Sequence, residues 1–403
     1  ISGFKTTPPA APVLPTADAA RDRVARTFYD KDGHVVGALD GEGFLSRTLY
    51  DEAGQKVEEV AFFNVTTASL RASGTFNQLL ASVGSHAEDR HLRFVHDGQG
   101  QLRYVVDGFD QVTEHGYNVA GQIIHTIRYA GSIAAAGDYS YDAVKALVAA
   151  SGLASHAATR KSWNVYDAAG RLAFAIDAEN AVTGYTYDSV GKAIKTVEFA
   201  VKRATSSLPA IATMDSWAAG QVANAANRIT RFYHAARGDL RFTVDAEGYL
   251  TRTDYDAESR VTREVRWAAP ISVDDSATIT TVNGLAAGSW VDTKYSYDAA
   301  GRLYSADDGE GIKRVYSYYA NGTLANQWVA YGHADEVRTV YVYDNAGRLA
   351  RRYDAYGTAD QVTTYQSYDG LGNLVSITDP NNNVTTRSYD RLGRMLSQTN
   401  ALN

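Results

Sequence analysis

Apolar and polar residues alternate in short stretches along this 403-residue chain, and each stretch lies between two turn signals. Leu172, Phe174 and Ile176 form one such series between Gly170 and Asp177. Seven residues at about 3.3 Å each make a strand of about 20 Å. Equivalent series are Leu102, Tyr104 and Val106, and Leu240, Phe242 and Val244. A period of two predicts strands with one buried face, on which the three residues of each series lie together.

Four-residue units of the form Asp-x-x-Gly separate these strands. They begin at Asp30, Asp40, Asp51, Asp97, Asp167, Asp188, Asp245, Asp298, Asp308, Asp344, Asp354, Asp369 and Asp390. Asp favours the first position of a type I turn, where its carboxylate accepts a backbone hydrogen bond, and Gly suits a fourth position with positive φ. Where Gly is missing, the fourth residue is Asp110, Asn180, Ser259 or Asn382. We therefore expect three-residue hairpin turns, with an irregular turn at His234, where one extra residue precedes Gly238.

A longer period of 64 to 70 residues runs over the first, because corresponding turns start at Asp30, Asp97, Asp167, His234 and Asp298. Each long module carries one insertion after its third turn. The insertions are residues 66–84, 137–152, 208–225 and 272–289. Because they occupy equivalent points, any helices in them should lie along one side of the sheet.

The first three insertions are predicted to form short amphipathic helices. In the first, an apolar helical face is formed by Phe76, Leu79, Leu80 and Val83. In the second, Asp142 and Gly152 suit the start and the end of a helix. The fourth insertion is rich in Thr, so its pattern does not favour a helix.

Tyr precedes many of the turns, and this adds a recognisable signature. "YDAAGRL" occurs at Tyr166 and Tyr297, and "YDNAGRL" at Tyr343. Over residues 26–403 the pattern resembles the YD repeats of the RHS family, which includes bacterial polymorphic toxins, the C component of insecticidal toxin complexes and teneurins. The resemblance implies a long antiparallel sheet that spirals into a hollow shell.

The expected fold is mainly β: a long antiparallel β-hairpin ribbon of YD repeats, curled into a spiral shell or solenoid, with short helical insertions. A twisted sheet of so many strands does not stay open and flat, and when curled it encloses more volume than its side chains fill. Residues 1–20 hold four of the seven prolines and are predicted to be a linker or plug, followed by a repeat domain over 21–403, a fragment of a longer array.

Composition excludes several classes of function. The net charge of −7 and a pI near 5.7, without a basic cluster, argue against a nucleic-acid partner. The longest apolar runs fall short of a membrane span, and the absence of Cys excludes disulfides and thiolate chemistry. No targeting segment follows Ile1, so the sequence is expected to be a piece of something longer.

No catalytic, cofactor-binding or metal-binding residue is assigned, no cofactor is expected, and binding residues are unknown. The aspartates are interpreted as turn residues, and "DPNNN" at 379–383 lacks the spacing of a calcium loop. "GEG" at 41–43 and 309–311 lies in hairpin turns. The other candidates are interpreted as surface histidines (His86, His91 and His96) and as tryptophans that pack rather than stack sugars (Trp163, Trp267, Trp290 and Trp328).

The leading hypothesis is a non-catalytic shell segment of a large exported bacterial protein, secreted or at the cell surface, that encloses and helps deliver a toxin or effector polypeptide. Its partners would be the rest of the same polypeptide or the enclosed effector. The alternative is an extended adhesive or carbohydrate-binding scaffold with a glycan or protein receptor. The face opposite the leucines is the candidate lining, through Arg103, Arg171, Arg241 and Arg302.

Overall fold

In the computed structural model, residues 23–135 and 137–400 are described. The chain divides into two compact units, which are treated separately below. The first unit comprises residues 1–95, 106–109 and 316–403, and the second comprises residues 96–105 and 110–315. The predicted linker or plug, residues 1–20, lies outside the described residues.

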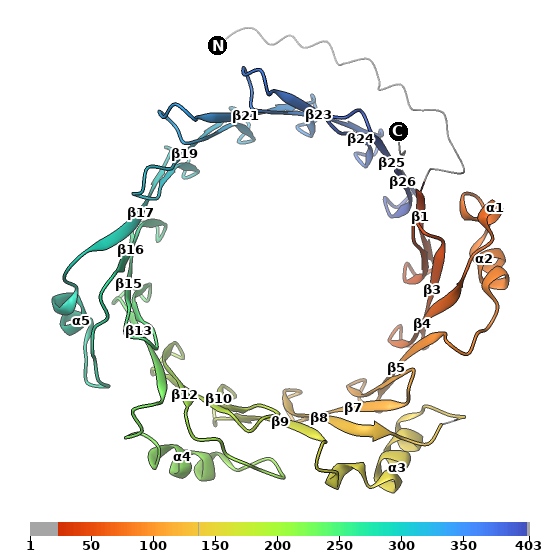
Figure 1. The fold of residues 1–403 in the computed structure, drawn as a ribbon, viewed down its shortest axis with the longest axis horizontal. Helices are drawn as coiled ribbons and strands as arrows, with labels where there is room; N and C mark the ends of the chain where they lie inside the picture. The colour runs from red at the N-terminus through yellow and green to blue at the C-terminus, as the bar shows by residue number, and fades with distance from the viewer. Residues whose placement is uncertain (1–22, 136, 401–403) are drawn as a thin grey trace. The chain divides into compact units, whose positions relative to one another are not determined.

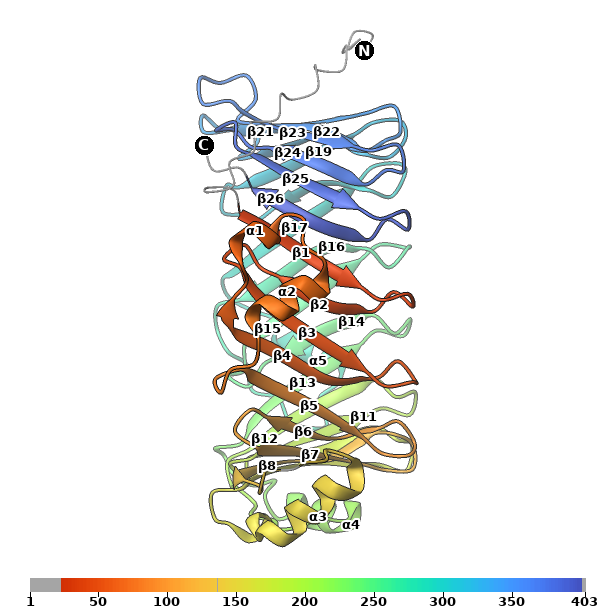
Figure 2. The same ribbon diagram turned by 90° about the vertical axis from the view of Figure 1, so that its right-hand side faces the viewer.

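The first unit contains an antiparallel sheet in the order β20 to β26 followed by β1 to β5. Its strands are β1 (Arg23–Tyr29), β2 (Val35–Leu39), β3 (Phe44–Tyr50), β4 (Lys56–Val65), β5 (Arg90–His96), β20 (Leu324–Val329), β21 (Val337–Tyr343), β22 (Leu349–Asp354), β23 (Val362–Tyr368), β24 (Leu374–Thr378), β25 (Val384–Tyr389) and β26 (Met395–Asn400). In Figure 2, β1 to β4 lie side by side, with α1 (Ala68–Arg71) and α2 (Phe76–Val83) over them.

The second unit contains a sheet in which each strand pairs with the next along the chain, from β7 to β18. Its strands are β7 (Gln111–Tyr117), β8 (Ile123–Ser132), β9 (Arg160–Tyr166), β10 (Leu172–Ile176), β11 (Val182–Tyr187), β12 (Ala193–Phe199), β13 (Arg228–His234), β14 (Leu240–Val244), β15 (Leu250–Tyr255), β16 (Val261–Trp267), β17 (Trp290–Tyr297) and β18 (Leu303–Asp307). Two further strands, β6 (Leu102–Asp107) and β19 (Lys313–Tyr318), run across the division between the units.

The predicted turns are confirmed. At Asp167 the backbone N–H donates to the carbonyl of Arg171 at 2.9 Å, and the N–H of Gly170 donates to the carbonyl of Asp167 at 3.0 Å. Gly170 has φ +76°. The four residues that replace Gly also take positive φ: 56° at Asp110, 64° at Asn180, 60° at Ser259 and 66° at Asn382.

The turn near His234 is regular, so the expectation of an irregular turn is wrong. Ala235 donates its N–H to the carbonyl of Asp239 and accepts from Gly238, as Asp does in the other turns. The turn therefore starts at Ala235, and His234 takes the place of the tyrosine. The sequence pattern gave the wrong start for this turn, because Ala235 replaces the aspartate and His234 replaces the tyrosine that mark the other turns.

All four insertions contain a helix: α1 and α2 in the first, α3 (Tyr141–Ser151, followed by a 3₁₀ turn at Leu153–Ser155) in the second, α4 (Ile211–Ala219) in the third and α5 (Ile279–Leu285) in the fourth. The three expected helices are confirmed, and Gly152 ends α3 with φ 68°. The Thr-rich fourth insertion is helical because Thr278 and Thr281 form a capping box at its start, which satisfies backbone donors there.

The helices pack on one face of each sheet, here called the helix-bearing face. Met214 of α4 packs against Trp163 and Phe174, and Val282 of α5 packs against Phe242. In the first unit α2 contributes Leu79 and Val83 to a similar core. Within each unit the sheet bends away from its helices, so the opposite, helix-free face is concave (Figure 1).

The ends of the ribbon differ from the expected spiral or solenoid, in which the first and last strands would be free edges. In the first unit β1 pairs with β2 on one side and with β26 on the other, from Arg23 opposite Asn400 to Arg26 opposite Ser397. This part of the prediction is wrong, because pairing satisfies the backbone groups that an open edge would leave exposed.

Candidate functional site

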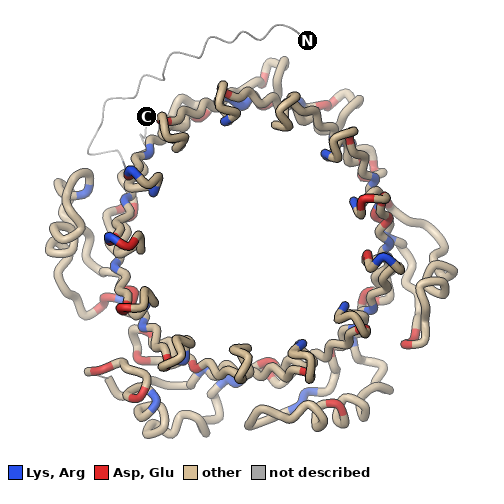
Figure 3. The backbone as a smooth tube through the Cα atoms, turned by 180° about the vertical axis from the view of Figure 1, so that it is seen from behind, with Lys and Arg blue, Asp and Glu red and all other residues tan. Residues whose placement is uncertain are grey.

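The turn aspartates are structural groups. The carboxylate of Asp167 accepts hydrogen bonds from the N–H groups of Ala169 and Arg171, both at 2.9 Å, and from Nε of Arg171 at 2.8 Å. The backbone N–H of Arg171, helped by its guanidinium, lowers the pKa of Asp167. Acidic and basic residues lie side by side at several turns (Figure 3). A carboxylate held ionised in this way is unsuited to general acid catalysis.

The Tyr of most Tyr-Asp pairs in the strands links its hairpin to a neighbouring one. The Tyr187 hydroxyl donates to the carbonyl of Leu172 at 2.9 Å, and the Arg171 guanidinium lies 4.8 Å from the centre of the Tyr187 ring. The same hydroxyl-to-carbonyl bonds, at 2.7–3.1 Å, join Tyr29 to Met395, Tyr50 to Val35, Tyr117 to Leu102, Tyr166 to Ile123, Tyr255 to Leu240, Tyr297 to Val261, Tyr368 to Leu349 and Tyr389 to Leu374. We call this series the tyrosine ladder.

A β-bulge follows the accepting carbonyl and explains one wrong prediction. Leu172 is opposite Tyr166, whereas Phe174 is opposite Val165, so one extra residue lies between them. Since Tyr166 and Val165 are consecutive, Leu172 and Phe174 lie on opposite faces of the sheet. A bulge disrupts the ladder of backbone hydrogen bonds and bends the strand, so the tyrosine hydroxyl satisfies a carbonyl where pairing is interrupted.

The same slip separates the four arginines that were expected to line the interior. Arg171 and Arg302 stay at their turns, bonded to Asp167 and Asp298. Arg241 is the extra residue of a bulge and pairs with Asp254 at 2.5 Å. Arg103 lies 5.6 Å from the ring centre of Tyr141 in α3, on the helix-bearing side. These arginines do not form one surface.

The helix-free face of the second unit carries many threonines and tyrosines, together with charged residues such as Glu198, Arg228 and Glu264. Its cross-strand pairs include Thr196 with Thr230 and Thr243 with Thr251. Further members are Thr113, Thr126, Thr183, Tyr185, Thr253, Thr293 and Tyr295. On the other face the positions under the helices, such as Phe174, Val182 and Phe242, are apolar and buried. Sequence reasoning missed this contrast, because the bulges shift which residues share a face.

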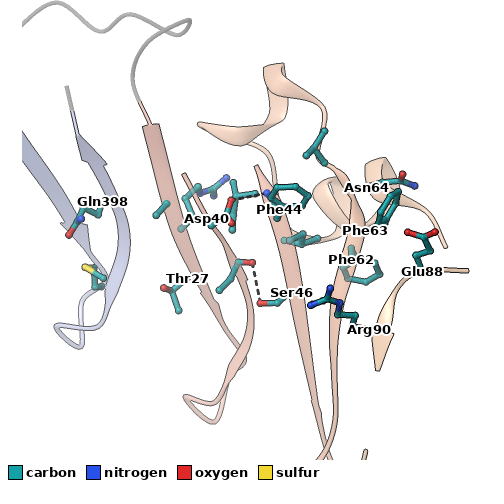
Figure 4. Close-up of a pocket in the computed structure, with 18 residues that line it drawn as sticks. Thr27, Asp40, Phe44, Ser46, Phe62, Phe63, Asn64, Glu88, Arg90 and Gln398 are labelled. Atoms are coloured by element: carbon teal, nitrogen blue, oxygen red, sulfur yellow. Dashed lines mark hydrogen bonds between the residues drawn. The ribbon is translucent and has the colours of Figure 1, made fainter. Parts of the chain in front are cut away.

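In the first unit the helix-free face has a hollow of about 910 Å³, which Figure 4 shows. A row of small residues crosses four strands there: Thr27, Ala38, Ser46 and Ala61. At one end of the hollow, Phe44 and Phe63 are 44% and 49% exposed.

The other sequence candidates remain apart. His91 bonds Glu58 at 2.9 Å, whereas His86 stacks on Phe63. In the described part of the chain no group of three or more His, Cys, Asp or Glu could hold a metal ion. Trp163 and Trp267 pack in the two cores of the second unit. Trp290 and Trp328 lie against arginines instead.

The other elements give two simpler results. Among the described residues no helix is long and apolar enough to cross a membrane. At "DPNNN" the carboxylate of Asp379 is occupied by the backbone N–H groups of Asn381 and Asn383 and by the Asn383 side chain.

The repeated turns, the bulged hairpins and the tyrosine ladder define a YD-hairpin protein. Residues 368–403 match the family model named RHS Repeat. Over these residues the match agrees with the RHS/YD-repeat resemblance that the sequence carries. No curated protein matches the chain.

Among solved structures, the chain is similar to that of TcdB2-TccC3 without its hypervariable C-terminal region: 16% identity, TM-score 0.47, 92% of this chain and 19% of that one. The Tc holotoxin pore of Photorhabdus luminescens is 15% identical with a TM-score of 0.41, and the match covers 92% of this chain and 19% of that one. A porin-like protein from Bacteroides uniformis is 12% identical with a TM-score of 0.23, and the match covers 59% of this chain and 93% of that one. The chain thus spans about a fifth of the two toxin-complex structures.

Proposed function

We propose that this chain is a non-catalytic wall segment of a larger exported RHS/YD-repeat protein that encloses an effector polypeptide and helps to deliver it. One observation carries the proposal: in each unit no helix of the described residues covers the concave helix-free face, and in the second unit this face carries hydroxyl-bearing and charged side chains. A core face would be apolar. A hydroxyl-rich surface can contact an extended guest while holding it weakly.

The hollow between β1 and β4 extends this role. Phe44 and Phe63 offer an apolar anchor beside a floor of small side chains. An aromatic or aliphatic side chain of the guest would fit there, while most of the guest would face threonines. Weak, distributed contacts of this kind allow release, because no single pocket dominates the binding free energy.

The turn chemistry supports a role without catalysis. The many carboxylates are occupied by backbone N–H groups and arginines, as at Asp167 and Asp298. They stabilise the wall rather than face a substrate. The guest would belong to the rest of the polypeptide that contains this chain or to a separate effector.

Site-specific photo-cross-linking tests the proposal in the full-length polypeptide that contains this chain. A benzophenone amino acid replaces Tyr295 on the helix-free face or, as a control, Leu285, which ends α5 and is 40% exposed. We expect position 295 to cross-link to segments outside residues 1–403 and position 285 not to do so. Cross-links at position 295 that are confined to residues 1–403 would contradict an enclosed guest.

A further inference from the structure

A groove lies on the helix-bearing face of the second unit, between α4 and the segment that leads into α5. It consists of two hollows, of about 850 and 560 Å³. Both are lined by Thr186, Lys195, Arg231, Asp274 and Asp275, so they form one continuous depression. We call it the insertion groove. It is separate from the helix-free face and from the proposed enclosure.

The floor of the insertion groove is apolar. Phe174, Val197 and Ile229 come from three strands of the sheet. Phe199 at the end of β12 and Ile211 at the start of α4 extend this surface at the side of the groove. An aliphatic or aromatic group placed there would bury apolar area that the groove leaves open, at about 25 cal/mol per Å².

The rim of the groove is acidic, because its cations are already paired. Its charged lining consists of Asp167, Asp188, Asp215, Asp274, Asp275, Arg171, Lys195 and Arg231. Arg171 pairs with Asp167, while Lys195 and Arg231 both pair with Asp275, at 2.5 and 2.8 Å. Among the described residues, Asp215 and Asp274 form no ion pair. The groove therefore favours a positively charged occupant.

We propose that the insertion groove binds a polypeptide segment in which an apolar side chain neighbours a lysine or arginine. The apolar side chain occupies the floor, and the cation is attracted to Asp215 and Asp274. The overall charge of −7 favours approach of the same kind of partner.

Fluorescence anisotropy with a fluorescein-labelled peptide, Gly-Ser-Phe-Lys-Gly-Leu-Arg-Ser-Gly, tests the proposal at low salt. We expect saturable binding that is lost when Lys and Arg become Glu, and also when Phe and Leu become Ser. Binding that survives either replacement would overturn the proposed chemistry, as would absence of binding by the original peptide.

Matched variants locate the binding. The pair Asp215→Asn and Asp274→Asn removes the unpaired carboxylates without changing side-chain volume, and we expect about tenfold weaker binding. The control pair Glu310→Gln and Asp335→Asn changes the net charge equally at residues that do not line the groove. Equal weakening by both pairs would overturn the assignment to this groove.

Discussion

The sheet of the second unit that lies under α4 and α5 and the strands β23 to β26 of the first unit use the same turns but different outer faces. The seventh residue after the start of the turn is Phe174 or Phe242 under a helix. At the same position β24 and β26 have Ser376 and Ser397, where no helix covers the sheet. Turn, bulge and tyrosine ladder are present in both regions.

This difference shows that the hairpin ribbon forms both with and without an apolar core on its helix-bearing face. Where a helix is present, side chains meet it and form a core; where it is absent, small hydroxyl side chains such as Ser388 and Ser397 bond each other at 2.6 Å. In β2 the same position is Gly37, because the ring of Phe76 from α2 occupies the space, 2.2 Å from where a Cβ would lie. The Phe76 ring of α2 therefore fills the space that a side chain at position 37 of β2 would need.

Acidification should have the largest effect, because it acts on the turns of both regions together. Hydrogen bonds to Arg171, Arg302 and Arg394 lower the pKa of Asp167, Asp298 and Asp390 below the ordinary 3.8. Above about pH 5 both folded and unfolded carboxylates are ionised, and the stabilisation is complete. Below 3.8 the unfolded chain binds protons first, so stability falls until the folded pKa values are passed. Unfolding temperature measured from pH 5 to pH 2 checks this.

Asparagine provides the control for that titration. Asn118 already occupies a turn position, where its side-chain oxygen accepts from the N–H groups of Ala120 and Gln122 at 3.0 Å. Asp298→Asn and Asp390→Asn should therefore keep the fold and flatten the acid profile. An unchanged profile would show that other groups cause the loss of stability.

Phe242→Ala should reduce the free energy of unfolding by about 3–5 kcal/mol, because a buried aromatic side chain is removed from beneath α5. Ser376→Ala at the equivalent uncovered position should change it by less than about 0.5 kcal/mol. Urea unfolding followed by circular dichroism measures both. Similar values for the two variants would contradict the separation of ribbon and core.

The tyrosine ladder should contribute equally in the two regions. Tyr187→Phe and Tyr389→Phe each remove one hydroxyl bond to a carbonyl, at a cost of about 1 kcal/mol. Tyr185→Phe, two residues from Tyr187 on the same strand, is the matched control. A cost confined to one region, measured by the same urea unfolding, would show that the ladder is not a general device.

Ala235→Asp should give the smallest effect, a slight rise in unfolding temperature. The turn at Ala235 has regular backbone bonds but lacks the carboxylate that accepts backbone N–H groups at the other turns. Differential scanning calorimetry measures the change. A fall in unfolding temperature would mean that this turn differs from the others in more than its first side chain.

The sequence predicted the turns well, because each depends on local chemistry: Asp at the first position and a residue that tolerates positive φ at the fourth. Even Ser259, a weaker former of that conformation, was located correctly. The faces were not predicted, because a bulge adds one residue without a sequence signal and moves Leu172 to the side opposite Phe174. This extra residue decides which side chains lie on the helix-free face and which lie on the helix-bearing face.

The strand ends could not be predicted, because pairing between β1 and β26 joins residues that are remote in sequence. The insertion groove was also beyond sequence reasoning. Asp215 and Asp274 lie in different insertions, and only the folded structure brings them to one depression. By contrast, helix capping by Thr278 and Thr281 is a local signal that could have been read from the fourth insertion.

The junction of β26 with β1 reproduces the internal junctions: Arg394 lies 4.5 Å from the ring centre of Tyr29, whose hydroxyl bonds the carbonyl of Met395. The contacts at this junction are therefore the same as those between hairpins that follow each other in the sequence. A strand edge of this kind accepts any hairpin with the same turn and tyrosine, however far away that hairpin lies along the chain.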